Sequence, residues 1–567
     1  MESQRSIRNV NLLYLTAFLA LLAGSVVMAS LSLGWRLVIN ELLLLGVPLA
    51  VYLLLTGGDA SNILRVRGVS WAVAGLSLVV GLGLWRFDWW LATTINEALD
   101  YTIPLPPEAL NVTLLDQILM VLGTVVLAPI IEELLFRGAV QTAYERRGPL
   151  IGVVVSSLLF MTIHLELAQS VAILPVAVAM GYAAWRTNSV LPAVLIHFAN
   201  NGQAMLVSAL QEGGVRRVGF TPSPLIGLIG GLVAVAALWL VTRLTRRPGP
   251  ERPGREPPGR EPSSPAQSVW RWLGRIWPLF PVVPIYLFVI AAALVIGVRP
   301  EILALGQELE LAPAPWEEET RWTYEIRNAL EEPVGEAECS VAPDADAFVL
   351  ECSMEQSGYE ADAPTGFFQE GGVSQTQTVR WDRETLTLED AVIEATAAAG
   401  EGEISVAARL EGGGLAVEVD GVEEMEGQFD RCYQLDQQGE SENPPAVQDP
   451  CQVEDGFLAG GGFFSPLMVG EWPWRFSALP FQLTYSRRVD IVWPYRGVEG
   501  VDGRAPARGD GFVVVRTAEQ VSTPAGDFVT WRVTVGEKYT AWYTVEAPHH
   551  LVAYSDDMVS WRLTGVE

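Results

Sequence analysis

Residues 128–141 read APIIEELLFRGAVQ, and this stretch decides how the chain is organised. It places Glu132 and Glu133 inside, and Arg137 just after, the apolar segment 115–136, which is long enough to cross a bilayer. Ionisable groups in hydrocarbon cost several kcal/mol each unless they are partnered. Glu133 and Arg137 are spaced i,i+4 with the acid first, which favours an ion pair and leaves Glu132 pointing about 100° away. We therefore expect a helical membrane bundle with a functional site in its interior.

Two more apolar segments carry polar side chains at a matching depth. His164 lies in the segment 149–165, and His197 and Asn201 share one face of a later segment because they are four residues apart. Counted at about 1.5 Å per residue, Glu132, His164 and Asn201 each lie roughly 20 Å from the cytoplasmic ends of their helices, with His197 one turn shallower. We expect the three helices to pack together and bring these side chains into one cavity.

The first half of the chain holds nine apolar runs of membrane-spanning length, and the second half has none. The runs cover residues 11–33, 37–55, 69–87, 115–136, 149–165, 169–186, 189–209, 222–243 and 277–297. The first run is too long for a cleavable signal peptide, and a second span follows almost at once. Arginines precede the first span and follow the even-numbered spans, with Arg216 and Arg217 as the exception, whereas the loop 88–116 contains acids but no Lys or Arg. The positive-inside rule then puts the N-terminus in the cytoplasm and residues 298–567 outside.

The negative charge of the chain is concentrated in its second half. Of 66 acidic and 37 basic residues, 50 and 17 fall in residues 298–567, so this half carries a net charge of −33 and the first half +4. A surface this acidic repels phosphate. We therefore expect no nucleic-acid partner.

All four cysteines, Cys339, Cys352, Cys432 and Cys451, also fall in the acidic half. An even number confined to one non-membrane domain favours disulfides in an oxidising compartment. The simplest of the three possible connectivities pairs Cys339 with Cys352 and Cys432 with Cys451, and free buried thiols are the alternative. Neither pair has the spacing of a structural zinc site. The cysteines and the charged loops agree on an extracytoplasmic location for this domain.

We divide the chain into a helical bundle (1–245), a Pro/Gly/Arg-rich cytoplasmic linker (246–275), a ninth transmembrane helix (276–298) and an acidic extracytoplasmic domain (299–567). β-Branched and aromatic residues clustered between Gly, Pro and Asp turns predict that the last part is mainly β. The predicted fold is thus a polytopic α-helical membrane bundle followed by a mainly β domain. His549 and His550 are neighbours, so we expect surface residues on opposite faces of a strand rather than metal ligands.

The polar side chains in the bundle suit hydrolysis by an activated water. The candidates for catalysis are Glu132, His164, His197 and Asn201, supported by Glu133 and Arg137. A buried carboxylate can act as a general base near neutral pH, and imidazole and amide donors can stabilise the oxyanion of a tetrahedral intermediate. Alternatively, Glu132, His164 and His197 could hold Zn²⁺, which lowers the pKa of a bound water. The residues alone do not separate a metal-free glutamate mechanism from a metal one.

The same residues form three ordered motifs, EExxxR, FxxxH and HxxxN, within APIIEELLFRGAVQ, SSLLFMTIHLEL and VAVAMGYAAWRTNSVLPAVLIHFANN. This pattern resembles the CAAX-processing and bacteriocin-processing (CPBP or Abi) family of intramembrane proteases, which includes the Rce1-type prenyl-protein endopeptidases. The resemblance extends loosely over residues 1–245. It implies an eight-helix bundle with a catalytic cavity in the membrane, where Glu132 activates water. It further implies that His164 and His197 act as metal ligands or proton donors and that Asn201 helps to form the oxyanion site.

We expect an intramembrane endopeptidase of the bacterial cytoplasmic membrane, with a membrane-associated or lipidated peptide or membrane protein as its substrate. The alternative is a non-proteolytic receptor or bacteriocin-immunity-type protein whose outer domain binds an unknown ligand. The intact motifs favour the endopeptidase over the receptor. A transporter that uses Glu132 and the histidines as a proton relay is a third possibility, but the sequence shows no sign of inverted repeats.

Overall fold

The structure is a computed structural model in which the chain forms two compact units, Met1–Tyr101 with Asn111–Val298, and Arg299–Glu567. It describes residues 7–28, 30–57, 59–99, 101, 107, 113–212, 222–245, 273–298, 309, 311, 313–328, 330–356, 373–397, 403–411, 414–420, 427–429, 432–435, 447–448, 458–459, 472–483, 485–497, 504–536, 539–555 and 559–567. Most of the predicted linker 246–275 lies outside these residues, as do Cys451 and the side chain of Cys432.

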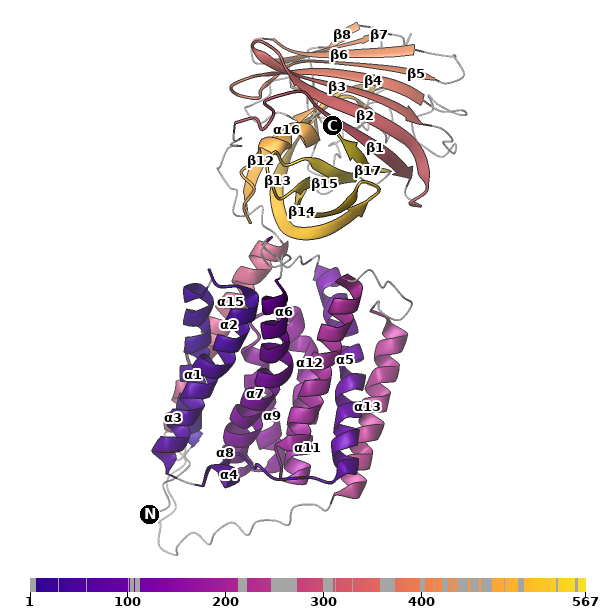
Figure 1. Cartoon of the computed structure of the whole chain (residues 1–567). Coiled ribbons are helices and arrows are strands. Elements are labelled where there is room, and N and C mark those ends of the chain that lie inside the picture. The colour runs from indigo at the N-terminus through magenta and orange to yellow at the C-terminus, as the bar shows by residue number, and fades with distance from the viewer. Residues whose placement is uncertain are drawn as a thin grey trace, which may run out of the picture. The chain divides into compact units, whose positions relative to one another are not determined.

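Helices that run side by side make up the first unit (Figure 1). Its first part contains α1 (Ile7–Val27), α2 (Leu33–Ile39), η1 (Asn40–Gly46), α3 (Val47–Thr56), α4 (Ala60–Ile63) and α5 (Trp71–Leu99). The next part contains α6 (Leu114–Val121), η3 (Leu122–Leu127), α7 (Ala128–Glu133), η4 (Leu134–Val140), α8 (Gln141–Glu145), α9 (Pro149–Thr162) and α10 (Leu167–Ala172). The last part contains α11 (Leu174–Thr187), α12 (Leu191–Glu212), α13 (Pro224–Leu244), η5 (Trp277–Leu279) and α15 (Val282–Val298). The segments η1, η3 and η4 are π-helical.

The bundle is that of a multi-pass membrane protein. Within the described residues, seven helical segments are long and apolar enough to cross a membrane: Ile7–Val27, Leu33–Thr56, Trp71–Leu99, Leu114–Glu145, Leu167–Thr187, Pro224–Leu244 and Leu273–Val298. The two other predicted spans coincide with α9, which is apolar but only 14 residues long, and with the 22-residue α12. A helical segment therefore lies at each predicted span.

Helix α5 is longer than the sequence predicted. We expected it to end at residue 87 and assigned Asp88 to an outer loop, whereas the helix continues to Leu99. The Asp88 carboxylate accepts a hydrogen bond of 3.2 Å from the Nδ2 of Asn200 on α12, and Asn200 is buried. An acid with a polar partner is tolerated inside a helical bundle. Its partner is remote in sequence, which is why the loop assignment was wrong.

Glycines allow the helical segment Leu33–Thr56 to lie directly against the segment Leu114–Glu145. A Cβ atom at Gly34 would lie 2.7 Å from the backbone oxygen of Asp116, and one at Gly123 would lie 2.8 Å from the Cβ of Leu37. Both distances are well below the optimal separation of about 3.5–4.0 Å between non-bonded carbon atoms. This close approach brings η1 against α7, the helix that carries the two glutamates.

A single sheet, antiparallel over most of its length, forms the second unit (Figure 1). Its first strands are β1 (Thr320–Asn328), β2 (Pro333–Pro343), β3 (Ala347–Gln356), β4 (Val373–Asp382), β5 (Leu388–Ala397), β6 (Glu403–Glu411), β7 (Gly414–Asp420), β8 (Gly427–Phe429) and β9 (Cys432–Leu435). The remaining strands are β10 (Val447–Gln448), β11 (Leu458–Ala459), β12 (Ser486–Gly497), β13 (Arg504–Thr523), β14 (Gly526–Val535), β15 (Tyr539–Thr544), β16 (Leu551–Ser555) and β17 (Val559–Val566). This confirms the prediction of a mainly β domain.

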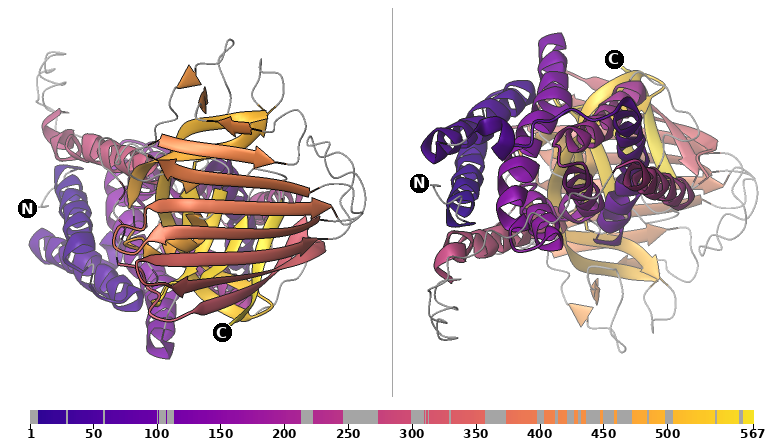
Figure 2. Two further views of the ribbon diagram at one scale, coloured as in Figure 1. Left: turned by 90° about the horizontal axis from the view of Figure 1, so that it is seen from above. Right: turned by 90° about the horizontal axis from the view of Figure 1, so that it is seen from below.

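The first and the last strands of the sheet are neighbours. Strands β1 to β8 pair in chain order, and β17 to β12 pair in reverse chain order. Strand β1 pairs with β17 as well as with β2, which joins the two halves of the sheet. Figure 2 shows the first half as an array of red to orange strands with the yellow strands of the second half behind it.

An aromatic core holds the curled sheet together. The short helix α16 (Trp472–Arg475) and the 3-10 turn η7 (Phe476–Ala478) contribute to it, and Trp472 and Trp474 are each only 1% exposed. The rings of Trp472 and Tyr554 lie 5.8 Å apart, and those of Trp474 and Trp561 lie 6.2 Å apart, so both tryptophans contact the C-terminal strands. Large aromatic side chains bury much apolar area and dominate the energetics of such cores.

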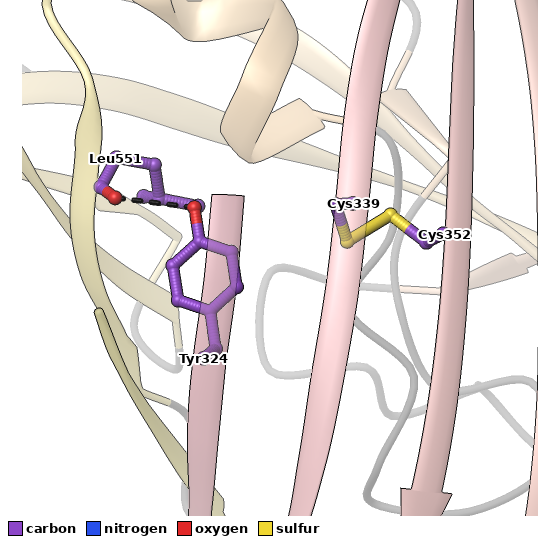
Figure 3. The surroundings of a disulfide bond; sticks show 4 residues. All are labelled: Tyr324, Cys339, Cys352 and Leu551. Carbon is purple, nitrogen blue, oxygen red and sulfur yellow. Dashed lines mark hydrogen bonds between the residues drawn. A yellow bond between two sulfur atoms is a disulfide. The ribbon is translucent and has the colours of Figure 1, made fainter. Parts of the chain in front are cut away.

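Strands β2 and β3 are joined by a disulfide between Cys339 and Cys352 (Figure 3). The two residues are direct partners in the antiparallel register, with Cα atoms 4.0 Å apart. This is one of the two predicted pairs, whereas the pair Cys432–Cys451 falls outside the described side chains. Figure 3 also shows the Tyr324 hydroxyl on β1 donating a 3.1 Å hydrogen bond to the Leu551 carbonyl on β16.

The expectation that His549 and His550 are surface residues of a strand is wrong. Both precede β16 and are half-buried. The Nδ1 of His550 accepts a 3.2 Å hydrogen bond from the indole N–H of Trp322, and the His549 ring lies 4.5 Å from the ring of Phe481. Both histidines therefore have structural contacts, which come from distant parts of the chain.

Candidate functional site

The helical segment Leu114–Glu145 changes its pitch on both sides of the two glutamates. The π-helical η3 precedes α7, and the π-helical η4 follows it. Pro129 lies in the first turn of α7, where it has no N–H to donate and frees backbone carbonyls of the preceding turn. Single π-helical turns often occur at functional sites, because they redirect side chains.

Glu133 and Arg137 form the ion pair that their spacing predicted. The Nη1 of Arg137 donates to the Oε1 of Glu133 at 2.8 Å, and both side chains are 0% exposed. The Nη2 of Arg137 donates to the Ala177 carbonyl of α11 at 3.0 Å, and the guanidinium lies 4.4 Å from the ring centroid of Phe160 on α9. Arg137 thus connects three helices, and its charge is compensated by Glu133 inside the bundle.

His197 of α12 lies between the two glutamates and is 3% exposed. Its Nδ1 is 3.0 Å from the Oε1 of Glu133, and its Nε2 is 3.9 Å from the Oε2 of Glu132. Because a carboxylate paired with Arg137 only accepts hydrogen bonds, Nδ1 carries the proton and donates to Glu133. In the neutral imidazole, Nε2 then presents its lone pair toward Glu132.

His164 approaches this group across the ring of Phe160. It follows the end of α9, and its Nδ1 is 3.0 Å from the Phe160 carbonyl oxygen, which can only accept. This contact assigns the proton to Nδ1 and leaves Nε2 free. The Phe160 ring centroid lies 5.0 Å from that of His164 and 5.7 Å from that of His197. In the described part of the chain, no direct hydrogen bond joins His164 to Glu132.

Asn201 lies one turn beyond His197 and contacts a different helix. Its Nδ2 donates a 2.9 Å hydrogen bond to the Thr124 carbonyl of η3. A π-helical turn leaves backbone carbonyls without their usual partners, so this contact satisfies one of them. Only one of the two amide N–H groups of Asn201 is needed for this bond.

Sequence reasoning missed Glu41, which lies on η1 and is 7% exposed. Its carboxyl group lies near that of Glu132 on α7, the helix that η1 contacts. The only signal was a single acid in the apolar span 37–55, where the sequence gives no partner at helical spacing. A lone intramembrane acid marks a functional site by default, and this one belonged in the predicted set.

The candidate metal ligands do not form a compact ligand set. Zinc in proteins needs three or four ligand atoms, each about 2.0–2.3 Å from the ion. Within the described residues, no group of three His, Cys, Asp or Glu side chains is arranged to hold a metal ion. Glu132 and His197 lie close together, but His164 stands across Phe160. We therefore derive no chemical step through a metal.

The fold and this site define a multi-pass membrane protein with a buried carboxylate–imidazole centre at the junction of η1, α7, α9 and α12. Residues 114–203, which contain all three motifs, match the family model described as type II CAAX prenyl endopeptidase Rce1-like. This stretch of the helical unit is therefore similar to that family. At the level of this family, the match supports an intramembrane CAAX-type endopeptidase, a hydrolase whose substrate is a membrane-associated peptide.

No curated protein matches the chain. One solved structure, a beta-barrel-like protein of a domain of unknown function from Brucella abortus, aligns with 46% of this chain and 99% of its own length. The alignment has 10% sequence identity and a TM-score of 0.26.

Proposed function

We propose that this protein is an intramembrane endopeptidase that hydrolyses peptide bonds of membrane-associated or lipidated proteins, with Glu132 as the base that activates water. One observation carries this proposal. The Oε2 of Glu132 is buried without a hydrogen-bond partner among the described residues, and it faces the Nε2 of His197 at 3.9 Å. A buried acceptor without a partner is costly, so the pair of atoms suits a bound water.

The gap between these two atoms has the right size for a shared water. A separation of 3.9 Å is too long for a direct hydrogen bond. A water at about 2.8 Å from both atoms would subtend an angle of about 90° between them, which is near the tetrahedral preference of its two protons. Glu133 and Arg137 support this arrangement because they fix the tautomer and the orientation of His197.

In the proposed reaction, Glu132 takes one proton from the water while the water oxygen attacks the carbonyl carbon of the scissile peptide bond. The carbonyl oxygen becomes an oxyanion, which the second amide N–H of Asn201 is available to stabilise. Collapse of the intermediate breaks the C–N bond. The proton held by Glu132 passes to the leaving amine, which restores the carboxylate. His164 lies across the Phe160 ring from this group. Its Nε2 would assist the reaction as a hydrogen-bond acceptor.

We further propose that the protein lies in the bacterial cytoplasmic membrane with its N-terminus in the cytoplasm and residues 299–567 outside. Arginine-rich loops on one side and a disulfide in the β unit support this orientation. Cysteine labelling is expected to find engineered sites at residues 250–265 inside and sites near residue 440 outside. The opposite labelling pattern would overturn the orientation.

The decisive experiment compares peptide termini in membranes of cells that express the wild-type protein or Glu132→Gln at matched levels. Gln keeps the shape of Glu132 but cannot take a proton. Glu97→Gln at the exposed end of α5 is the matched control. Termini that are present with the wild type and the control but absent with Glu132→Gln would support proteolysis and identify substrates. Identical profiles for all three proteins, also under envelope stress, would favour the non-proteolytic receptor or immunity-type protein.

A further inference from the structure

A cavity of about 350 Å³ lies between α5, α11 and α13, apart from the centre described above. Its volume is at the lower end of the range found for small-molecule sites. The walls are apolar except for the hydroxyl group of Tyr182, and α11 and α13 supply most of them, with Pro175, Val178 and Ala179 on one side and Val235 and Leu238 on the other. The cavity therefore suits the apolar part of a ligand.

One end of this cavity is polar, because the two helix faces that line it continue into polar residues. Arg186 lies one turn beyond Tyr182 on α11, and Thr242 lies one turn beyond Leu238 on α13. The hydroxyl oxygens of Tyr182 and Thr242 are 3.2 Å apart. The Nη2 of Arg186 donates to the Thr242 carbonyl at 2.8 Å. An apolar cavity thus ends at a guanidinium group and two hydroxyl groups.

The guanidinium group of Arg186 is buried with part of its hydrogen-bonding capacity unused. The side chain is 6% exposed, and its Nε and Nη1 have no hydrogen-bond partner in the part of the chain that the structure describes. Its Nη2 bonds to backbone carbonyls at the end of α13, those of Thr242 and Thr245. No acidic side chain of the described residues forms an ion pair with Arg186. A buried cation is costly without an anion, and arginine favours phosphate oxygens.

The polar end of the cavity lies where the two helices reach the membrane surface. Arg186 is the second-last residue of α11, and α13 ends at Leu244, so both chains leave the bilayer here. Trp239 is 54% exposed, and the guanidinium of Arg243 lies 4.8 Å from its ring centroid, a combination typical of the membrane interface. From Arg186 to Pro175, at the other end of the cavity, α11 rises about 16 Å. This is about half of a hydrocarbon core of about 30 Å, which is the depth of one lipid leaflet.

We propose that this cavity binds one acyl chain of an anionic phospholipid, whose phosphate group accepts hydrogen bonds from the Nε and Nη1 of Arg186. The second cation at this end, Arg243, favours a headgroup with a net negative charge over a zwitterionic one. None of the three motifs includes a residue of this site, and lipid binding does not require that the protein cleaves peptides. The lipid would nevertheless support the catalytic centre, because Val178 lines the cavity and the carbonyl of its neighbour Ala177 accepts from Arg137.

Native mass spectrometry tests the headgroup contact. The full-length protein in detergent is titrated with phosphatidylglycerol or phosphatidylcholine that carry the same acyl chains. We expect the wild type to bind phosphatidylglycerol more tightly. Arg186→Gln keeps a donor for the Thr242 carbonyl but removes the charge, so its affinity for phosphatidylglycerol should fall by about 10-fold to 100-fold. Arg147→Gln, at an exposed arginine between α8 and α9, is the matched control and should bind like the wild type.

A second variant tests the place of the acyl chain. Leu238→Trp fills the apolar part of the cavity and leaves Arg186 unchanged. It should weaken the binding of both lipids, whereas Arg186→Gln should remove only the preference for phosphatidylglycerol. This variant also keeps the proposal testable if Arg186→Gln does not fold. Phosphatidylglycerol that binds Leu238→Trp as tightly as the wild type would overturn the proposed position of the chain.

Two further outcomes would overturn the phospholipid. One is equal affinity of the wild type for the two lipids, or a preference for phosphatidylglycerol that persists in Arg186→Gln. The other is competition by farnesol, which has an isoprenyl chain and no phosphate. If farnesol displaces phosphatidylglycerol at equal concentration, the cavity holds an isoprenyl chain instead. All these readouts are measured without a peptide substrate, so they stand or fall separately from the proposed protease activity.

Discussion

Breaking the ion pair between Glu133 and Arg137 should destabilise the membrane unit, because it leaves a buried charge without a partner, and Glu133→Gln tests this. The substitution keeps an amide oxygen that can still accept from the Nδ1 of His197, so it removes charge with little change in shape. For charges about 4 Å apart, an effective dielectric constant of about 20 gives an interaction of about 4 kcal/mol. Both side chains are 0% exposed, so water cannot replace the lost partner. We expect a loss of about 3 to 5 kcal/mol in the free energy of unfolding.

The assay is titration of the full-length protein from mild detergent into sodium dodecyl sulfate, with helical circular dichroism as the readout. Glu97→Gln serves as the control for a surface acid. The double variant Glu133→Gln/Arg137→Met should recover to within about 1 kcal/mol of the wild type, since it leaves no unpaired buried charge. A loss below about 1 kcal/mol for Glu133→Gln would refute the reasoning. So would a double variant as unstable as the sum of the two single variants.

Three further predictions concern the disulfide, a histidine and metals. Replacing Cys339 and Cys352, which are 13 residues apart, by serine should lower the stability of the β unit by at most about 3 kcal/mol, seen as a lower Tm that matches that of the reduced wild type. Burial lowers the pKa of His550, and the neighbouring His549 lowers it further. The unfolded chain therefore binds more protons than the folded protein at pH values below about 6.5, the ordinary pKa of histidine. Thermal stability should therefore be full above about pH 6.5 and fall as the pH drops toward the folded-state pKa, and His550→Gln, which can still accept from Trp322, should remove this dependence. Cleavage that depends on Glu132 should change less than about twofold after divalent metals are removed by a chelator, because the described ligands do not converge; a loss restored by zinc would contradict this.

Much of the membrane unit could be predicted because its signals are local. Apolar length located the helices, and the i,i+4 rule identified the Glu133–Arg137 pair, since both are properties of a single segment. The meeting of His197 with the two glutamates required only that three helices pack at similar depth. The exact bounds were harder, as α5 shows, because Asp88 is partnered by a residue more than a hundred positions away.

Other parts of the site depend on tertiary contacts that no local pattern reports. Glu41 has no polar neighbour at helical spacing, so its partner on α7 could be found only from the packing of η1. The π-helical turns have the same apolar sequence character as the α-helical turns beside them. The prediction for His549 and His550 was wrong for a related reason. Their partners, Phe481 and Trp322, lie far from them in the sequence.

The pairing of β1 with β17 has a consequence for how the β unit is made. The chain between these strands must be synthesised in full before the sheet can close, since its first strand waits for its last. Translation at about 5–20 residues per second would take roughly 12 to 50 s to cover that interval. During this time, β1 exposes an unpaired edge, which is a template for wrong strand pairing. A nascent, half-open sheet therefore needs protection from wrong strand pairing, and demand for chaperones should rise with the expression of this protein.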